Sequence, residues 1–416
     1  MKRNLCTFVA QYKQHMKIGI IREEKSPKDN RVPLTPSQCR MLMEEHPELW
    51  IAVQPSDHRC YTNDEYRWQG VPVREDLSGC DYLLGVKEIP VEYILPDKTY
   101  LIFSHTIKKQ PHNKKLLQTF MKQQSSLIDY ECLKDTKGKR IIAFGRWAGI
   151  VGAYHALRMV GLRSGAFTIR QMSECHNFAE AQKELSKMKL PPINIVLTGT
   201  GRVSEGAAFL LELSGIKKVE PSDLLRREFN EPVYAQLESK HLFYRDGLDE
   251  FNSEDYHKNP ELYHSAFYPF TKVTDLFING IYWDKRIPVF FSKEQMNAAD
   301  FRIAQIADIT CDIAPDASVP STLRASTIAE PYYGYQPGTA SIAPPFTKEV
   351  IDVMAIDNLP NELPRDASED FGNMLISRII PKILQGNHPV IHHATIVNKG
   401  KLNEPFLYLK DYADMN

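Results

Sequence analysis

Short apolar runs alternate with amphipathic stretches along much of the chain. Runs that are typical of buried strands occupy residues 17–21, 50–53, 82–86, 100–103 and 127–128. Helix-like stretches separate them, among them residues 113–122 and a helix that Ser37 could cap and that continues through Leu42. Strand–helix alternation of this kind predicts a parallel α/β sheet in the first third of the chain.

A long apolar helix is expected over residues 141–162, with Gly145, Gly149 and Gly152 on it. Glycine at about every fourth position lets a neighbouring backbone approach closely, although each glycine costs roughly 1 kcal/mol of helix propensity relative to alanine. We interpret this helix as the connector between two domains.

A second α/β pattern starts at residue 193 and continues past residue 313. A polar, aromatic-rich insertion without a clear period lies at about residues 226–270, and the last strong helix is expected over residues 366–384. The sequence therefore predicts an α/β protein of two Rossmann-like domains with a cleft between them, joined by the long helix. The expected segments are an N-terminal extension (1–16), a substrate and catalytic domain (17–145 and 357–416) and a dinucleotide-binding domain (146–356).

Composition and charge narrow the class of protein. The 51 Lys and Arg residues nearly balance the 52 Asp and Glu residues, which argues against a nucleic-acid binder. No apolar run approaches the roughly 18 residues that a membrane span needs. The seven cysteines are odd in number and form no Cys-x-x-Cys pair, and the histidines lack ligand spacing. We therefore expect no metal site and a reducing, cytoplasmic compartment.

A glycine-rich turn follows the apolar run at residues 193–198. Gly199 permits a tight turn and Gly201 lets the backbone approach a pyrophosphate, whose charge the helix N-terminus at Arg202 and Val203 favours. This strand, turn and helix is the context of a dinucleotide site, although Ser204 stands where a third glycine is usual. The alternative is a glycine-rich turn that binds nothing.

Charged residues after later strands are further cofactor candidates. Glu220 lies 21 residues after Gly199, where a carboxylate can accept from a ribose hydroxyl and favour NAD. Arg226 and Arg227 lie nearby and could meet the 2′-phosphate of NADP instead. Asp312 follows the apolar run that ends near Asp308, a loop position that suits the ligand crevice or an ordinary turn equally well.

Two neighbouring strand ends carry proton-transfer groups. Lys87 and Glu88 follow the run at 82–86, and His105 follows the run at 100–103. An amine and an imidazole can move protons near neutral pH if the surroundings lower the pKa of the amine. Each residue alone is more often a surface lysine or a cap-like histidine.

Further charges could hold a substrate. Asp129 and Glu131 stand after a third strand. Arg22, Arg31 and Arg140 could grip carboxylates, because a guanidinium group matches a carboxylate with two parallel hydrogen bonds, although a single arginine is more often a solvated surface group.

As an ordered set, several motifs resemble the superfamily of alanine dehydrogenase and the lysine-forming saccharopine dehydrogenases. Residues 22–24, 31–36, 85–88 and 103–108 carry the superfamily resemblance. Residues 127–131, 143–149, 278–283 and 356–360 narrow it to the saccharopine branch, and to the lysine–2-oxoglutarate reductase half of the bifunctional aminoadipic semialdehyde synthases.

The resemblance implies the roles of individual residues. It implies a catalytic pair of Lys87 and His105, and a substrate site formed by Arg31, Glu88, Glu131 and Arg140. It places Asp312 on the nicotinamide side and Asp357 at the cofactor. The implied reaction joins lysine and 2-oxoglutarate through NADH or NADPH to form saccharopine, reversibly.

Two other functions fit part of the pattern. An alanine dehydrogenase-like enzyme needs only one carboxylate clamp, so the additional Glu and Arg residues disfavour it. A non-catalytic NAD(P)-binding protein could lose Lys87 or His105, and both are present.

Overall fold

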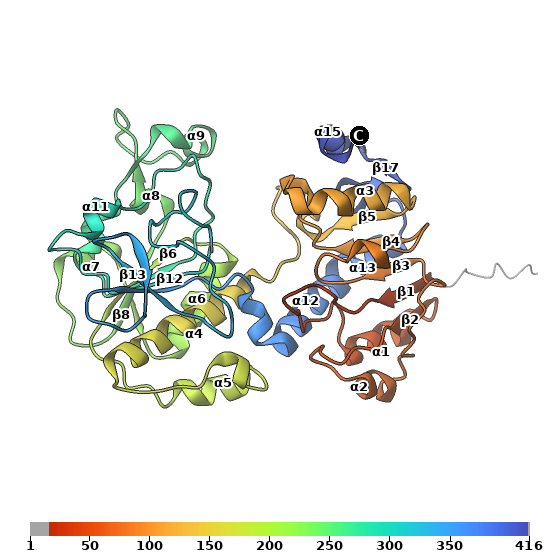
Figure 1. Ribbon diagram of the computed structural model, residues 1–416, viewed down its shortest axis with the longest axis horizontal. Coiled ribbons are helices and arrows are strands. Elements are labelled where there is room, and N and C mark those ends of the chain that lie inside the picture. Colours follow the sequence, from red (N-terminus) through yellow and green to blue (C-terminus); the bar gives the residue numbers. More distant parts are fainter. Residues whose placement is uncertain (1–15, 415–416) are drawn as a thin grey trace, which may run out of the picture. The chain divides into compact units, whose positions relative to one another are not determined.

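The structure is a computed structural model that describes residues 16–414. Its internal contacts divide the chain into two units, one of residues up to Ala143 and from Pro364 onward, the other from Phe144 to Leu363. Both units are Rossmann-like α/β structures (Figure 1). The expected extension at 1–16 lies outside the described residues except for Met16, which begins the first strand. In the part described, no helix has the length and apolar character that a membrane crossing requires.

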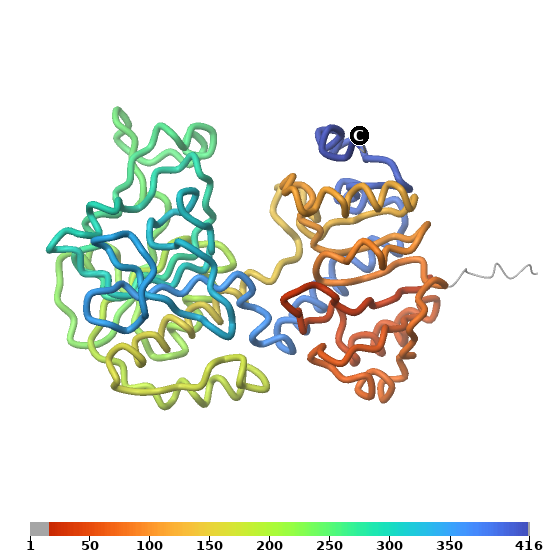
Figure 2. The backbone as a smooth tube through the Cα atoms, viewed as in Figure 1, coloured from red at the N-terminus to blue at the C-terminus, as the bar shows by residue number. Residues whose placement is uncertain are grey.

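The first unit is built on one sheet whose strand order is β17-β16-β5-β4-β3-β1-β2. Strands β1 to β5 are parallel to one another. At one edge of the sheet, β16 pairs antiparallel with β5, and β17 pairs antiparallel with β16. Figure 2 shows that both ends of the chain, red to orange and blue, build this unit. Its strands are β1 (Met16–Ile20), β2 (Leu49–Val53), β3 (Tyr82–Leu84), β4 (Thr99–Ile102), β5 (Ser126–Asp129), β16 (Thr395–Asn398) and β17 (Lys401–Leu402).

The helices of the first unit are α1 (Pro36–Glu45), α2 (Asn63–Trp68), α3 (Lys114–Lys122), α12 (Pro364–Arg378), α13 (Ile380–Leu384), α14 (Pro389–Ala394) and α15 (Lys410–Ala413). The cap of α1 is Thr35 and not Ser37. Thr35 accepts from the backbone N–H of Gln38 while the Gln38 side chain accepts from the N–H of Thr35, a reciprocal cap. The single helix expected over 366–384 is broken at Ile379, because Pro381 has no N–H to continue the ladder.

The second unit has a sheet of strand order β14-β13-β15-β12-β11-β6-β8-β7. Its strands from β15 to β7 in that order are all parallel. The strands are β6 (Asn194–Thr198), β7 (Lys217–Val219), β8 (Val233–Leu237), β11 (Leu276–Asn279), β12 (Gln305–Asp308), β13 (Tyr333–Gln336), β14 (Ser341–Ala343) and β15 (Ile351–Met354), with a small hairpin of β9 (Phe243–Tyr244) and β10 (His264–Ser265).

The insertion at 226–270, whose sequence shows no clear period, contains regular strands and helices. It supplies β8, which lies inside the sheet between β6 and β7. It also supplies part of an apolar core, in which Phe243, Tyr256 and Phe267 are buried. The aromatic composition of the stretch therefore reflects core packing.

The long helix, α4 (Gly145–Ser164), begins four residues later than expected and packs within the second unit against α6 (Arg202–Leu213). A Cβ on Gly149 would lie 1.8 Å from the backbone oxygen of Val203, and a Cβ on Gly206 would lie 2.1 Å from that of Arg146. The glycines therefore let the two helices approach at backbone contact. The other helices of this unit are α5 (Phe178–Leu185), α7 (Pro221–Arg226), α8 (Ser239–Leu242), α9 (Ser253–Lys258), α10 (Tyr268–Thr271) and α11 (Lys293–Met296).

Candidate functional site

In the first unit, the predicted proton-transfer residues follow adjacent parallel strands. β3 ends at Leu84 and pairs with β4, with Leu84 opposite Leu101. Lys87 therefore follows the carboxyl end of one strand and His105 that of its neighbour. The expected adjacency of these two strands is confirmed, and the catalytic roles stay predictions.

A buried glutamate that the sequence did not single out holds the backbone at Lys87. The carboxyl group of Glu23 accepts from the N–H of Val86 at 2.6 Å and from the N–H of Lys87 at 2.9 Å. Burial, and then the charge of Asp29, raises the pKa of Glu23 to about 8. Glu23 thus fixes where the Lys87 side chain starts.

Glu88 connects the imidazole to a second lysine. Its Oε1 lies 2.5 Å from Nδ1 of His105, and its Oε2 accepts from Nζ of Lys25 at 2.8 Å. Burial opposes ionisation of Glu88, yet the hydrogen bond and charge of His105, together with Lys25, lower its pKa to about 2. Glu88 is therefore a carboxylate at neutral pH and orients the His105 ring.

Lys87 has the electrostatic environment that a proton-transfer amine needs. Burial, and then the positive charge of Arg31, lowers the pKa of Lys87, while Asp29 and Glu88 act in the opposite direction. A lowered pKa makes the free base accessible nearer neutral pH.

Arg31 is paired inside the protein. Its Nε and one terminal nitrogen meet the two oxygens of Asp29 at 2.9 and 2.5 Å, and the Arg31 side chain is buried. Its charge acts on Lys87 from this position. A direct contact with a substrate carboxylate stays a prediction.

Glu131 and Arg140 form a second charged pair. A terminal nitrogen of Arg140 donates to Oε1 of Glu131 at 2.7 Å; the arginine is half exposed and the glutamate is buried. Among residues 16–414, Oε2 of Glu131 has no hydrogen-bond partner. A buried carboxylate oxygen without a donor is rare, and an ammonium group of a substrate is a suitable donor.

In the second unit, the glycine turn fits a dinucleotide pyrophosphate. Gly199 has φ +92°, and a Cβ there would lie 2.8 Å from Oγ of Ser204. At Gly201, by contrast, a Cβ would have no other described atom within 4 Å, so the space before α6 is open. Arg202 and Val203 begin this twelve-residue helix, whose N-terminal N–H groups attract an anion.

The substitution of the third glycine has a structural reason. The hydroxyl of Ser204 is buried and donates to the backbone oxygen of Thr198 at 2.8 Å. Gly206, two residues later, makes a different close contact, in which α6 meets the backbone of α4.

The carboxyl ends of β12 and β15 carry the predicted acidic residues. Asp312 follows β12 and Asp357 follows β15, the neighbouring parallel strand. Burial raises the pKa of the Cys311 thiol to about 12, and the negative charges of Asp308, Asp357 and Asp312 act in the same direction. Asp308 itself is buried and accepts from Asn279, Thr310 and Thr322.

Glu220 does not follow the strand next to the glycine turn. It follows β7, an edge strand that pairs with β8. Arg226 ends α7, and Nε of Arg227 pairs with Asp223 at 3.2 Å. β6 lies between β11 and β8, and the acidic residue after β8 is Glu238. The apolar run Val233–Leu237 was the available signal for this strand.

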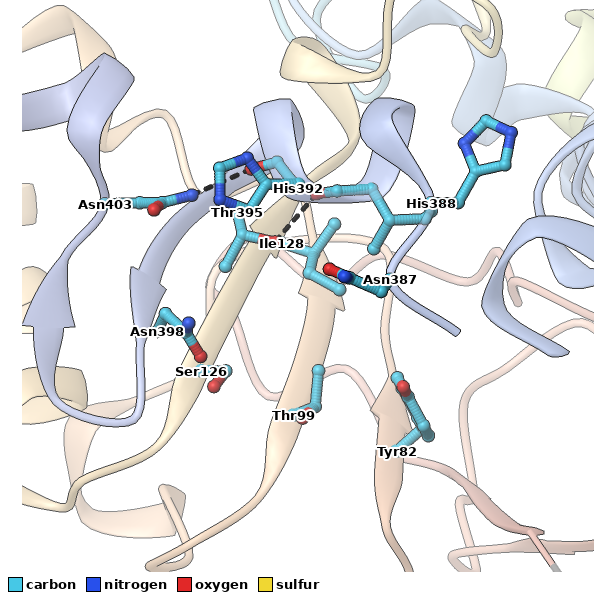
Figure 3. A pocket seen from close by; sticks show the side chains of 11 residues that line it. Tyr82, Thr99, Ser126, Ile128, Asn387, His388, His392, Thr395, Asn398 and Asn403 are labelled. Atoms are coloured by element: carbon cyan, nitrogen blue, oxygen red, sulfur yellow. Dashed lines mark hydrogen bonds between the residues drawn. The ribbon is translucent and has the colours of Figure 1, made fainter. Parts of the chain in front are cut away.

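A separate polar pocket lies in the first unit at the amino ends of the strands (Figure 3). Tyr82, Thr99 and Ser126 begin three adjacent strands there, with His392 above them on α14. The His388 ring points away from the other labelled side chains. The pocket lining lacks carboxylate and ammonium groups and lies at the opposite strand ends from Lys87, so it does not contribute to the predicted chemistry.

As for metals, no group of three or more His, Cys, Asp or Glu side chains within the described range 16–414 could hold an ion.

Comparisons with known proteins find one matching family model and several similar sequences. Residues 19–151 match the family described as alanine dehydrogenase/PNT, N-terminal domain. The chain is 31% identical over 400 residues to alpha-aminoadipic semialdehyde synthase of Arabidopsis thaliana, and 30% identical over 444 residues to the mitochondrial alpha-aminoadipic semialdehyde synthase of Bos taurus. These matches cover 86% and 94% of this chain but 37% and 47% of those proteins, so the chain spans less than half their length.

A shorter relative matches over nearly its whole length. The chain is 26% identical to saccharopine dehydrogenase [NAD(+), L-lysine-forming] of Emericella nidulans, with 88% of this chain and 91% of that protein covered. Among solved structures, an L-alanine dehydrogenase matches with a TM-score of 0.64 at 15% identity, covering 96% of this chain and all of that one. The transhydrogenase of Sinorhizobium meliloti matches with a TM-score of 0.54. These structures support the fold.

Proposed function

Because the chain belongs to the family of the lysine-forming saccharopine dehydrogenases, within the alanine dehydrogenase superfamily, we propose that it is an NAD(P)-dependent oxidoreductase of this specificity. In the proposed reaction, L-lysine, 2-oxoglutarate, NAD(P)H and a proton give saccharopine, NAD(P)+ and water, reversibly. The partly buried Lys87, beside the hydrogen-bonded Glu88 and His105, is the observation that supports this assignment most directly.

The residues of the first unit suit the bond changes of this reaction. The ε-amine of the substrate lysine must attack the ketone carbon of 2-oxoglutarate as a free base, so one proton must leave the nitrogen. The resulting carbinolamine must gain a proton on oxygen before water leaves and a C=N bond forms. Lys87 and His105 are the proposed groups that take and return these protons, since both are nitrogen bases of suitable type.

Charge complementarity suggests which residues bind each of the two substrates. Arg140, which is half exposed, is the proposed partner of a carboxylate of 2-oxoglutarate. Glu88 and Glu131 are the proposed partners of the cationic amino acid, and the unpaired oxygen of Glu131 suits an ammonium donor. Arg31 is proposed to add its positive charge to the dicarboxylate site.

The second unit is proposed to hold the dinucleotide. The N–H groups of Gly201, Arg202 and Val203 are suited to the pyrophosphate, and Asp312 and Asp357 to its nicotinamide side. When bound, the dinucleotide supplies the hydride that reduces the imine carbon. Within the first unit, Glu88 keeps the imidazole of His105 oriented.

A direct assay tests the proposed function. The full chain is incubated with NADH or NADPH and either lysine plus 2-oxoglutarate or pyruvate plus ammonium. Oxidation of the dinucleotide that requires both lysine and 2-oxoglutarate supports the proposal. Oxidation with pyruvate and ammonium alone would instead identify an alanine dehydrogenase-like enzyme, and binding without turnover would identify a non-catalytic dinucleotide-binding protein.

A further inference from the structure

A long loop follows β12 in the second unit. Residues 309–332, all of which the structure describes, contain no helix and no strand beyond the single bridging residue Ser326. Irregular loops longer than about 12–15 residues are uncommon in compact domains, and most are either functional or disordered. This loop carries Asp312, to which the proposed function gives the nicotinamide side. The contacts that hold the loop therefore bear on the proposed chemistry.

Asp308, the last residue of β12, is the point to which the loop is attached. Its side chain is fully buried. Its Oδ1 accepts from the hydroxyl of Thr310 at 2.6 Å, and its Oδ2 accepts from the hydroxyl of Thr322 at 2.6 Å. One carboxylate therefore holds both ends of the segment 310–322, which contains Asp312.

The same carboxylate connects the loop with the glycine turn. Asn279, at the end of β11, donates to Oδ1 of Asp308 at 2.9 Å and to the hydroxyl oxygen of Ser318 at 2.7 Å. The side-chain oxygen of Asn279 accepts from the hydroxyl of Thr198, the residue before Gly199, at 2.8 Å. These side chains are buried, and β6, β11 and β12 are neighbouring parallel strands. A continuous chain of hydrogen bonds thus crosses three strand ends.

The donors around Asp308 suit a carboxylate, which only accepts hydrogen bonds. Burial raises the pKa of Asp308, and the hydrogen bonds from Thr310, Thr322 and Asn279 oppose that rise. A buried polar network of this kind specifies one arrangement as long as its members are paired. The loss of one hydroxyl from the network should therefore loosen the loop.

We propose that Asp308 is a positioning residue that fixes the Asp312 loop relative to the glycine turn. Because Asp308 is fully buried, it touches no ligand and acts through Asp312. The inference rests on the proposed function for the role of Asp312, and it adds what holds that residue in place.

The loop contact can be removed while the carboxylate stays. Thr322→Val replaces the hydroxyl with a methyl group, and Thr322→Ser keeps the hydroxyl. Thr274→Val is the matched control, because Thr274 is equally buried and, within residues 16–414, its hydroxyl has no hydrogen-bond partner. Urea unfolding of each full-chain variant checks that it is folded in the assay. Ser318→Ala removes the other loop contact and replaces Thr322→Val if that variant does not fold.

Thr322→Val should lower kcat for lysine-dependent oxidation of NAD(P)H by ~10-fold or more, because a small displacement of an active-site group is costly. The dinucleotide Kd should change by less than ~3-fold, since the pyrophosphate is held at the helix N-terminus. The isotope effect from NAD(P)H deuterated at C4 should rise, and Thr322→Ser should restore most of kcat. A purely structural role would lower the urea midpoint and leave kcat and the isotope effect at the values of Thr274→Val, and that result would overturn the inference.

Asp312→Asn tests whether Thr322 acts through Asp312. The double variant Thr322→Val/Asp312→Asn should then be no slower than Asp312→Asn alone, because the two changes affect one interaction. Losses that multiply would show that the loop contact acts elsewhere.

The two proposals fail separately. Lysine-dependent turnover in the wild type, with unchanged kcat in Thr322→Val, would end the role of Asp308 and leave the function intact. Without lysine-dependent turnover the proposed function is wrong, and amide hydrogen exchange then decides whether Asp308 holds the loop. Faster exchange at residues 309–322 in Thr322→Val, but not in Thr274→Val, would support that role, and equal exchange would overturn it.

Discussion

The backbone N–H of Lys87 donates to the carboxyl group of Glu23 at 2.9 Å, although 64 residues separate them in the chain. The same carboxyl group also accepts from Val86, so it spans two successive backbone donors at the end of β3. Glu23 is therefore a positioning residue for the amine that we propose as a catalytic group.

The stability of the protein should depend on the ionisation of Glu23. Burial raises its pKa from 4.5 to about 8, so between these values the folded protein keeps a proton that the unfolded chain has lost. Stability then falls as pH rises through this window. The urea midpoint of the wild type should fall relative to that of Glu23→Gln from pH 5 to pH 8, a window set by the two pKa values.

The neighbouring Glu24 provides a matched control, because it is exposed and pairs with Arg22. Glu24→Gln should give a midpoint that runs parallel to the wild type over the same range. Parallel curves for Glu23→Gln as well would show that Glu23 does not titrate as its burial requires.

Removal of either proposed proton-transfer group should slow turnover and spare dinucleotide binding. Lys87→Met and His105→Gln should each lower kcat by roughly 10²- to 10⁴-fold, the range for loss of a general acid or base. The measurement is steady-state kinetics beside an NADH binding titration. Lys122→Met, on the exposed side of α3, is the control for loss of a lysine. Near-normal kcat in Lys87→Met would exclude the amine from the chemistry.

Arg140→Ala should act mainly on one substrate. Loss of its guanidinium group removes a charged hydrogen bond to a carboxylate, so the KM for 2-oxoglutarate should rise by roughly 10-fold or more. The KM for lysine should change less. Arg40→Ala, in an exposed pair with Glu44 on α1, should leave both constants as they are. An unchanged KM for 2-oxoglutarate in Arg140→Ala would assign the dicarboxylate to another residue.

The contact between α4 and α6 should not tolerate a methyl group. In Gly149→Ala the new Cβ would lie 1.8 Å from the oxygen of Val203, so the helices must move apart, at a cost of about 1–3 kcal/mol or more in unfolding free energy. Because Val203 begins the proposed pyrophosphate helix, NADH binding should weaken too. Gly79→Ala, where no described atom lies within 4 Å of the Cβ, should change stability by less than ~0.5 kcal/mol. Equal stability in both variants would contradict the close approach.

The sequence predicted the elements whose signals are local. Apolar runs bounded by glycine or polar residues identified β1, β3, β4 and β6, and the turn after β6 carried its own glycine pattern. The order of strands within a sheet is not local. β8 was missed because its five residues follow Pro232 inside an aromatic-rich stretch, and the position of Glu220 at a sheet edge depends on that strand.

In the candidate site, too, local sequence signals predict some features and not others. Lys87 and His105 follow strand ends, and strand ends can be read from apolar runs. The contacts that set their chemistry join distant segments: Glu23 with Lys87, and Glu88 with His105. No spacing rule in a single sequence predicts such pairs, because they form only when parallel strands come together in the sheet.

The division of the chain at Ala143 and Leu363 also sets the order in which the two units can fold during synthesis. The second unit is one uninterrupted stretch, so it can acquire its structure as soon as that stretch has emerged. The first unit cannot: β16, which borders β5, is translated only after the entire second unit. Until β16 is synthesised, β5 is an unpaired edge of the first sheet. Truncations near the C-terminus should therefore destabilise the first unit, most of which is synthesised first.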